Sequence, residues 1–262
     1  MAPTSRPVGA VTRGTTNPNR LRRMDRWIAA VQGPALRRMA APVAVDLGYG
    51  AAPWTAVELL ERLRVAAPRV SVVGVEIEPE RVAGAQEYAR EGLRFVRGGF
   101  EVPVAGEIGL IRAANVLRQY DEEQVAAAWS RLCGRLAPGG LLVEGTCDEV
   151  GRRQVWVALG PEGPRTVTFA ARLGSLATPS DLAERLPKAL IHRNVPGEPV
   201  HAFLRDFDRA WAAAAPYAAL GARQRWVRAV AAMATEWPVV DRPGRWRQGE
   251  VTVEWNALAP RH

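Results

Sequence analysis

Cysteine is scarce in this sequence, and so are long apolar runs. The 262 residues include only two cysteines, Cys133 and Cys147. They lack the spacing of a metal site and are too few for a disulfide framework. No apolar stretch approaches the roughly 20 residues that span a bilayer, and residues 1–30 contain arginines but no apolar signal segment. We therefore expect a soluble, cytoplasmic protein with no bound metal and no membrane partner.

Lysine is almost absent, because Lys188 is the only one. Arginine therefore supplies nearly all the positive charge of a chain with 35 basic and 27 acidic residues and a net charge of +8. Residues 1–40 contain eight arginines and one acid, Asp25, which leaves the rest of the chain close to neutral. Such an arm can bind phosphates through its guanidinium groups. The alternative is a solvated leader whose second half packs as a helix.

The order of apolar segments predicts an α/β protein. Short apolar runs typical of buried strands alternate with segments of helical spacing, as a doubly wound, mostly parallel sheet requires. The strands are expected at 43–46, 72–76, 93–96, 108–112 and 141–144, and the helices at 55–67, 79–90 and 121–136. A turn is expected at 137–140 and helix caps at Thr55 and Asp121.

The pattern changes after Glu144. Two runs, 154–159 and 165–171, flank Gly160–Pro164 and predict an antiparallel hairpin. Residues 180–237 have helical spacing, and an alternating segment at 251–255 is typical of an edge strand. The expected apolar stripes of the helical part are Val200, Phe203, Phe207 and Trp211, and then Trp226, Val230 and Met233.

These segments suggest three parts. Residues 1–40 form a basic arm and an amphipathic helix over 20–39 that is interrupted at Gly33-Pro34. Residues 41–175 are expected to form one α/β domain. Residues 176–262 form a helical appendage with the edge strand, packed on the same domain.

The segment Asp46-x-Gly48-x-Gly50 ends the first strand and precedes a helix and a strand that closes at Glu76. This unit is half of a nucleotide-binding sheet, whose ligand crevice lies at the carboxyl ends of the strands. A dinucleotide fingerprint needs a third glycine where this chain has Pro53. A carboxylate at Asp46 would repel a pyrophosphate and attract a cationic amine. The motif therefore predicts an adenosyl amino acid as the ligand rather than NAD.

Over about residues 42–145, these motifs resemble the class I S-adenosylmethionine (SAM) dependent methyltransferases. The resemblance implies a Rossmann-like fold and SAM as the cofactor. It also implies that the loop of Asp46, Gly48 and Gly50 wraps the methionine end of SAM. Glu76 would hold both ribose hydroxyls, as a carboxylate with two accepting oxygens can, and Ile77 would pack on adenine.

Two further positions carry the resemblance. Gly99 stands where the family often has an aspartate that contacts the adenine amine, so the backbone at Phe100 is expected to serve instead. Asn115, after the fourth strand, matches the position beside the transferable methyl group. Ala52 stands where many members have a third glycine.

The sequence assigns no catalytic residue. Methyl transfer from a sulfonium is a direct displacement, and a base is needed only where the acceptor must lose a proton. The candidates near the crevice or in the appendage are Asn115, Tyr120, Glu144 and His192, with Arg112, Asp148 and His201 as further titratable groups.

The methyl acceptor and the oligomeric state also stay open. RNA is suggested by the basic arm with Trp27 and by a second cluster, because arginine with aromatics combines phosphate contact and base stacking. That cluster is Arg242, Arg245, Trp246 and Arg247. A small-molecule acceptor is suggested by the apolar helical segment, which could cover a pocket. A SAM-binding protein without turnover is the third possibility.

Overall fold

The structure is a computed structural model that describes residues 7–12 and 16–261. Arg6 and Arg13 of the predicted basic arm lie outside the described residues. The chain forms two compact units. Unit 1 comprises Met1–Glu144, Glu149–Gly151 and Leu159–Gly163, and unit 2 comprises Gly145–Asp148, Arg152–Ala158 and Pro164–His262.

The strands follow the predicted order and form one sheet with the strand order β3-β2-β1-β4-β5-β6-β7-β8. β1 pairs in parallel with β2 and β4, β2 pairs in parallel with β3, and β7 pairs with β8 in antiparallel fashion. The order through β6 is that of doubly wound nucleotide-binding sheets, which confirms the predicted fold class. The strands are β1 Val43–Leu47, β2 Ser71–Glu76, β3 Leu93–Arg97, β4 Ile108–Ala114, β5 Leu136–Cys147, β6 Arg153–Gly160, β7 Gly163–Ala171 and β8 Glu250–Glu254.

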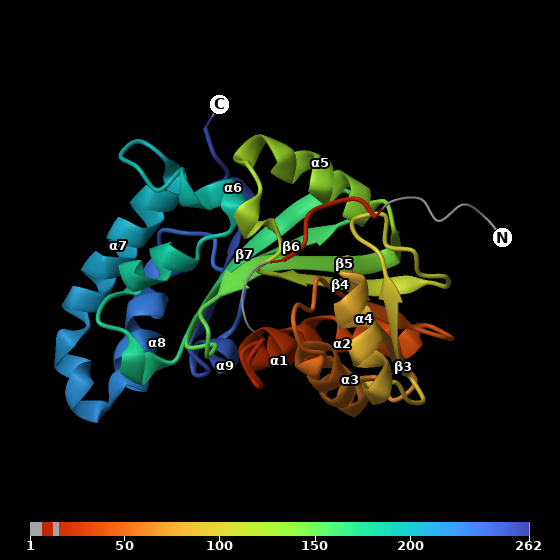
Figure 1. Cartoon of the computed structure of the whole chain (residues 1–262). Coiled ribbons are helices and arrows are strands. Elements are labelled where there is room, and N and C mark those ends of the chain that lie inside the picture. The colour runs from red at the N-terminus through yellow and green to blue at the C-terminus, as the bar shows by residue number, and fades with distance from the viewer. Residues whose placement is uncertain (1–6, 13–15, 262) are drawn as a thin grey trace. The chain divides into compact units, whose positions relative to one another are not determined.

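The helices of unit 1 pack on its strands. α1, α2 and α3 contact one another, and α4 contacts β2 and β3 (Figure 1). The predicted interruption at Gly33-Pro34 is confirmed, because α2 begins there. These helices are α1 Arg22–Val31, α2 Gly33–Arg38, α3 Trp54–Ala66, α4 Pro79–Ala85 and α5 Glu122–Cys133.

Three predicted boundaries in unit 1 are wrong. α3 begins at Trp54 rather than at a Thr55 cap, because the Thr55 hydroxyl donates to the Asp46 carboxylate at 2.7 Å. α4 ends at Ala85 and continues only as a 3₁₀ turn, Gln86–Tyr88. The expected turn at 137–140 lies inside β5, where Gly139 adopts a φ of +74° without ending the strand. By contrast, the predicted cap at Asp121 is confirmed as a capping box with Gln124.

Unit 2 has an aromatic core of its own. Both predicted helical stripes are buried, and α7 and α8 pack against each other (Figure 1). The rings of Phe207 and Trp226 lie 5.0 Å apart, and Phe203 stacks at 4.9 Å on Phe169 of β7. The helices are α6 Lys188–Ile191, α7 Pro199–Ala213, α8 Ala222–Met233, α9 Pro243–Trp246 and α10 Trp255–Leu258, with 3₁₀ turns at Leu117–Gln119 of unit 1 and at Leu173–Ser175, Pro179–Arg185 and Ala215–Leu220. Within the described residues, none of the helices has the length and apolarity that crossing a membrane requires.

Candidate functional site

A narrow cleft in unit 1 lies at the carboxyl ends of its parallel strands. The sheet adds strands in opposite directions from β1 and β4, and ligands of doubly wound sheets bind at this reversal. The cavity in this cleft has a volume of about 10 Å³, which is close to the minimum that holds one water molecule. Its lining is Ala10, Thr12, Leu47, Gly48, Glu76, Ile77, Gly98, Gly99, Phe100, Val116 and Tyr120.

The glycine loop after β1 has the backbone that its sequence predicts. Gly48 and Gly50 have φ values of +66° and +85°, in the left-handed region that glycine adopts without steric cost. A Cβ on Gly50 would lie 2.6 Å from the Thr16 hydroxyl oxygen. The loop therefore needs glycine both for its conformation and for the close approach of the N-terminal segment.

Glu76 ends β2 with a carboxylate that is almost fully buried, at 1% exposure. Oε1 accepts from the backbone N–H groups of Ile77 and Glu78 at 2.9 and 3.3 Å. Oε2 accepts from the backbone N–H of Gly50 at 3.0 Å and from the Thr12 hydroxyl at 3.3 Å. Since a carboxylate has about four acceptor positions, the chain itself uses all of them.

The loop after β3 supplies a donor and an acceptor side by side. The Phe100 N–H donates to the Val8 carbonyl at 2.8 Å, and the Glu101 carboxylate accepts the Val8 N–H at 2.8 Å. The next residue, Val102, is buried with a φ of +44°, a strained conformation for a β-branched residue. Strain of this kind is concentrated at functional sites, so the shape of this loop supports a binding role.

The sequence prediction for this loop missed Glu101. The family's acid at position 99 is replaced by Gly99, and the carboxylate of Glu101, two residues later, accepts from the Val8 and Gly99 N–H groups. The sequence could have indicated Glu101, because it is an acidic residue in the same short loop as Gly99. Its orientation depends on the Gly99 N–H, which donates to Glu101 at 2.8 Å.

Asp46 is held in a buried ion-pair network. The register of β1 and β4 pairs Asp46 with Arg112, whose Nη2 lies 2.8 Å from the carboxylate. The other side of the same guanidinium donates to Asp25 of α1. All three side chains are at most 3% exposed. Burial alone would lower the pKa of Arg112, but the charges of Asp25 and Asp46 outweigh it and raise that pKa.

This network corrects the charge argument for Asp46. The sequence predicted a carboxylate that attracts a cationic amine, whereas the structure gives it a cation from its own chain. Asp46 also accepts from the Thr55 hydroxyl at 2.7 Å, so it ties β1 to the start of α3. A role for Asp46 in ligand binding therefore works through the shape of the loop, and not through an unmatched negative charge.

The structure places the catalytic candidates in different surroundings. Tyr120 lines the cleft, where its hydroxyl accepts the Ala10 N–H at 2.5 Å. Asn115 follows β4 with a φ of +61°. Glu144 is fully buried in β5, and His192 is exposed in unit 2. The cleft lining thus includes only Tyr120 from this group.

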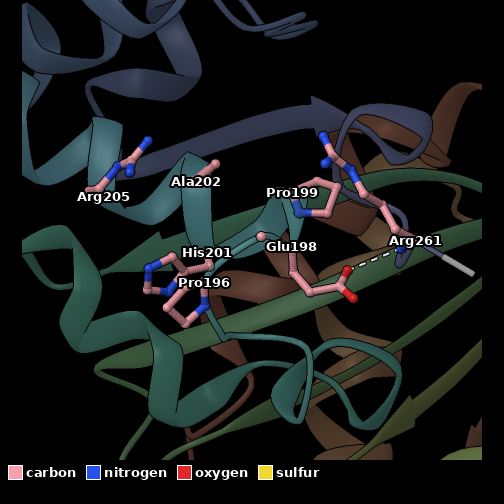
Figure 2. Close-up of a pocket in the computed structure, with 8 residues that line it drawn as sticks. Pro196, Glu198, Pro199, His201, Ala202, Arg205 and Arg261 are labelled. Carbon is pink, nitrogen blue, oxygen red and sulfur yellow. Dashed lines mark hydrogen bonds between the residues drawn. The ribbon is translucent and has the colours of Figure 1, made fainter.

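A larger cavity of about 420 Å³ lies in unit 2 at the start of α7 (Figure 2). Glu198 accepts the Arg261 N–H at 3.0 Å there and pairs with Arg193 at 3.6 Å. Its charge is therefore matched within the chain. The lining is Pro196, Gly197, Glu198, Pro199, His201, Ala202, Arg205 and Arg261.

The described part of the chain offers no metal centre, because it brings no three histidine, cysteine, aspartate or glutamate side chains together in a group that could hold an ion. Cys133 and Cys147 are both buried and are not joined in a disulfide.

No protein-family model and no curated protein matches the chain. Solved structures do match part of it. Human N-acetylserotonin methyltransferase in complex with SAM is 23% identical over 46% of this chain and 35% of that one, with a TM-score of 0.33. CalS10, an amino pentose methyltransferase from Micromonospora echinaspora, is 20% identical over 55% of this chain and 67% of that one, with a TM-score of 0.34.

A protein described as a pericyclic reaction enzyme also matches, at 17% identity over 44% of this chain and 30% of that one, with a TM-score of 0.35. The matched part of the chain spans about a third of the length of human N-acetylserotonin methyltransferase. These likenesses concern the fold of part of the chain, and one fold supports several chemistries.

Replacing Arg112 with leucine tests the buried network. In Arg112→Leu, Asp25 and Asp46 are left in the core without their shared cation, so we expect the free energy of unfolding to fall by about 3–5 kcal/mol. Urea denaturation measures this. The control is Arg90→Leu, which removes an exposed pair with Glu61 and should cost less than about 1 kcal/mol. Equal losses in the two variants would contradict the importance of the network.

The buried carboxyl group of Glu144 is expected to make the free energy of unfolding depend on pH. Burial raises its pKa to about 8, although a hydrogen bond from Trp129 opposes the shift. The unfolded chain releases this proton near pH 4.3, so between about pH 4 and 8 the folded state holds more protons. The free energy of unfolding therefore falls as pH rises through this window, by at most about 1.4 kcal/mol per pH unit.

The Glu144→Gln variant lacks this titration. Denaturation at pH 5 and pH 8 should show a smaller decline for the variant than for the wild type, and greater stability of the variant at pH 8. Glu61→Gln, whose side chain is 64% exposed, is the matched control and should follow the wild type. Parallel pH profiles for Glu144→Gln and the wild type would show that this carboxyl group does not cause the effect.

Proposed function

We propose that the cleft of unit 1 binds the adenosine part of SAM and that the chain is a SAM-dependent methyltransferase. The observation that carries the proposal is the convergence of the Phe100 N–H, the Glu101 carboxylate and the Glu76 carboxylate at one edge of the sheet. Adenine presents a ring acceptor beside an amino donor, and ribose presents two neighbouring hydroxyl donors. The Phe100 N–H and Glu101 complement the base, and the acceptor position of Glu76 that Thr12 uses in this structure complements a ribose hydroxyl.

The other residues of the cleft fit the same ligand. Gly48 and Gly50 allow the backbone to approach it closely, and Ile77 and Phe100 offer apolar surfaces for a flat ring. Asp46 would keep the glycine loop in place through Arg112. Bound SAM supplies an electrophilic methyl group on a sulfonium, so the main tasks of the chain are to orient the reactants and exclude water.

Tyr120 is the candidate that we favour for a contact with the methyl acceptor. Its hydroxyl lines the cleft, while Asn115 follows β4 beside Val116, which also lines it. The roles predicted for Glu144 and His192 have no comparable support from the cleft lining. Tyr120 and Asn115 are therefore the first positions to vary once an acceptor is known.

We favour a small-molecule acceptor over RNA. Trp27, proposed for base stacking, is buried at 4% exposure in α1. In the second cluster, Arg245 forms a 2.5 Å ion pair with buried Glu250, and the Trp246 indole donates to Asp241 at 2.7 Å. These groups have structural tasks within the chain, so the features that suggested RNA are reduced to exposed arginines.

SAM binding without methyl transfer is a second candidate function. It is favoured by the departure from the family pattern at Gly99. Consumption of labelled SAM in the presence of a metabolite extract distinguishes the two functions, because only an enzyme passes the label to an acceptor.

Calorimetry with SAM and its demethylated product tests the cofactor assignment. We expect both ligands to bind the wild type. Glu76→Gln should weaken both by about 30- to 100-fold, because it removes charge-assisted hydrogen bonds of about 2–3 kcal/mol. Glu80→Gln, on the exposed first turn of α4, is the control and should bind as the wild type does. If neither ligand binds the wild type or a variant whose N-terminal segment is displaced from the cleft, the cofactor assignment is wrong.

The acceptor can be identified by comparing a strain that lacks the gene with its parent. We expect a methylated small molecule to disappear from the deletion strain and its precursor to accumulate, because the chain would supply that methyl group. Mass spectrometry of metabolites and of digested RNA measures both classes in one experiment. Loss of a methylated nucleoside from RNA instead would favour the alternative acceptor.

A further inference from the structure

Residues 8–12 of the chain lie in the cleft that we assign to adenosine. Val8 contacts the groups expected at the adenine edge: its N–H donates to Glu101, and its carbonyl accepts from the Phe100 N–H, both at 2.8 Å. A residue that offers its N–H donor and its carbonyl acceptor in this way presents the same pair of groups as adenine. Val8 therefore forms the hydrogen bonds to Glu101 and to the Phe100 N–H that the adenine base would form.

Gly9 occupies the apolar part of the same site. A Cβ built on Gly9 would lie 3.3 Å from Ile77 Cδ1, 3.6 Å from Phe100 Cε2 and 2.9 Å from the Tyr120 hydroxyl. The φ of Gly9 is +126°, a conformation that side chains disfavour. Only a residue without a side chain can pass between these three groups, so a flat stretch of backbone lies in the space assigned to the adenine ring.

Thr12 takes the place of a ribose hydroxyl. Its Oγ1 donates to Glu76 Oε2 at 3.3 Å. Arg81 fixes Thr12 from the other side, because Nη1 donates to its carbonyl at 3.0 Å and to its hydroxyl at 3.2 Å. The segment is thus anchored both at the position of the base and at the position of the sugar.

Gly99 is matched to this segment. A Cβ at position 99 would lie 2.0 Å from the Val8 carbonyl oxygen, a distance that no real contact reaches. The aspartate expected at this position from the resemblance could not coexist with the segment. The departure at Gly99 therefore has a physical reason, namely that it makes room for Val8.

We propose that residues 8–12 act as an intramolecular substitute for adenosine, so that the cofactor binds only when the segment leaves the cleft. This inference rests on the proposed function and adds a regulatory step to it. The apparent dissociation constant is then the intrinsic constant divided by the fraction of molecules with an open cleft. Any change that weakens the segment tightens cofactor binding, and any change that strengthens it excludes the cofactor.

The test weakens the segment without altering the lining residues that lie outside it. Gly9→Val places a β-branched side chain at a φ of +126° and against Tyr120 and Ile77. Gly163→Val is the matched control, because Gly163 has a φ of +121° but a Cβ there has nothing within 4 Å. Thr12→Val is a milder second variant that removes the hydroxyl and keeps the shape.

Two measurements are made on the full chain. Calorimetry with the demethylated product of SAM should show binding about tenfold tighter for Gly9→Val and a few-fold tighter for Thr12→Val than for the wild type, because both raise the open fraction. Gly163→Val should bind as the wild type does. Hydrogen exchange should show slow amides at Val8 and Ala10 in the wild type, and fast exchange at both in Gly9→Val or after the ligand is added.

The outcomes separate the two proposals. If the ligand binds the wild type and Gly9→Val equally well, the segment does not compete and the inference is wrong, while the cofactor assignment stands. Fast exchange at Val8 and Ala10 in the wild type without ligand would also overturn it. If the ligand binds neither the wild type nor Gly9→Val, the cofactor assignment fails and the inference fails with it.

Discussion

The structure of unit 1 depends on one buried guanidinium. Arg112 joins Asp46 at the end of β1 to Asp25 in α1, and its Nη2 also donates to the Thr55 carbonyl in α3 at 2.9 Å. Arg62 of α3 pairs with the same Asp25 at 2.6 Å. A buried charge is stable only when it is paired and hydrogen-bonded, so the two helices and the two strands must meet in one arrangement.

This constraint explains how the cleft keeps its shape. The network fixes the end of β1, from which the Gly48–Gly50 loop begins, while Glu76 binds the same loop through the Gly50 N–H. The loop is therefore held from both sides of β1, by β4 and by β2. A ligand that reaches the cleft meets a preformed backbone, and the mobile element in the proposal is the N-terminal segment.

The N-terminal segment changes the meaning of several sequence features. Gly99, which departs from the family pattern, is the residue that lets Val8 approach. Gly9 contributes no side chain but fits between Ile77 and Phe100. The arginines of the basic arm suggested phosphate binding. In the structure, the residues of the arm that contact the cleft are uncharged, namely Val8, Gly9 and Thr12. Val8 and adenine both present a hydrogen-bond donor beside an acceptor, so the segment can occupy the place of the ligand that it would exclude.

The sequence by itself determined the order of strands and helices, the doubly wound class and the edge where a ligand would bind, because local apolar periodicity and glycine turns encode these features. It failed where a partner on another strand or helix decides the outcome. Thr55 donates to Asp46 rather than capping its helix, and Arg112 neutralises a carboxylate that appeared available. Only the tertiary structure decided which groups of the cleft contact the chain itself, since the contacts of Val8 and Thr12 span more than 60 residues and leave no local signal.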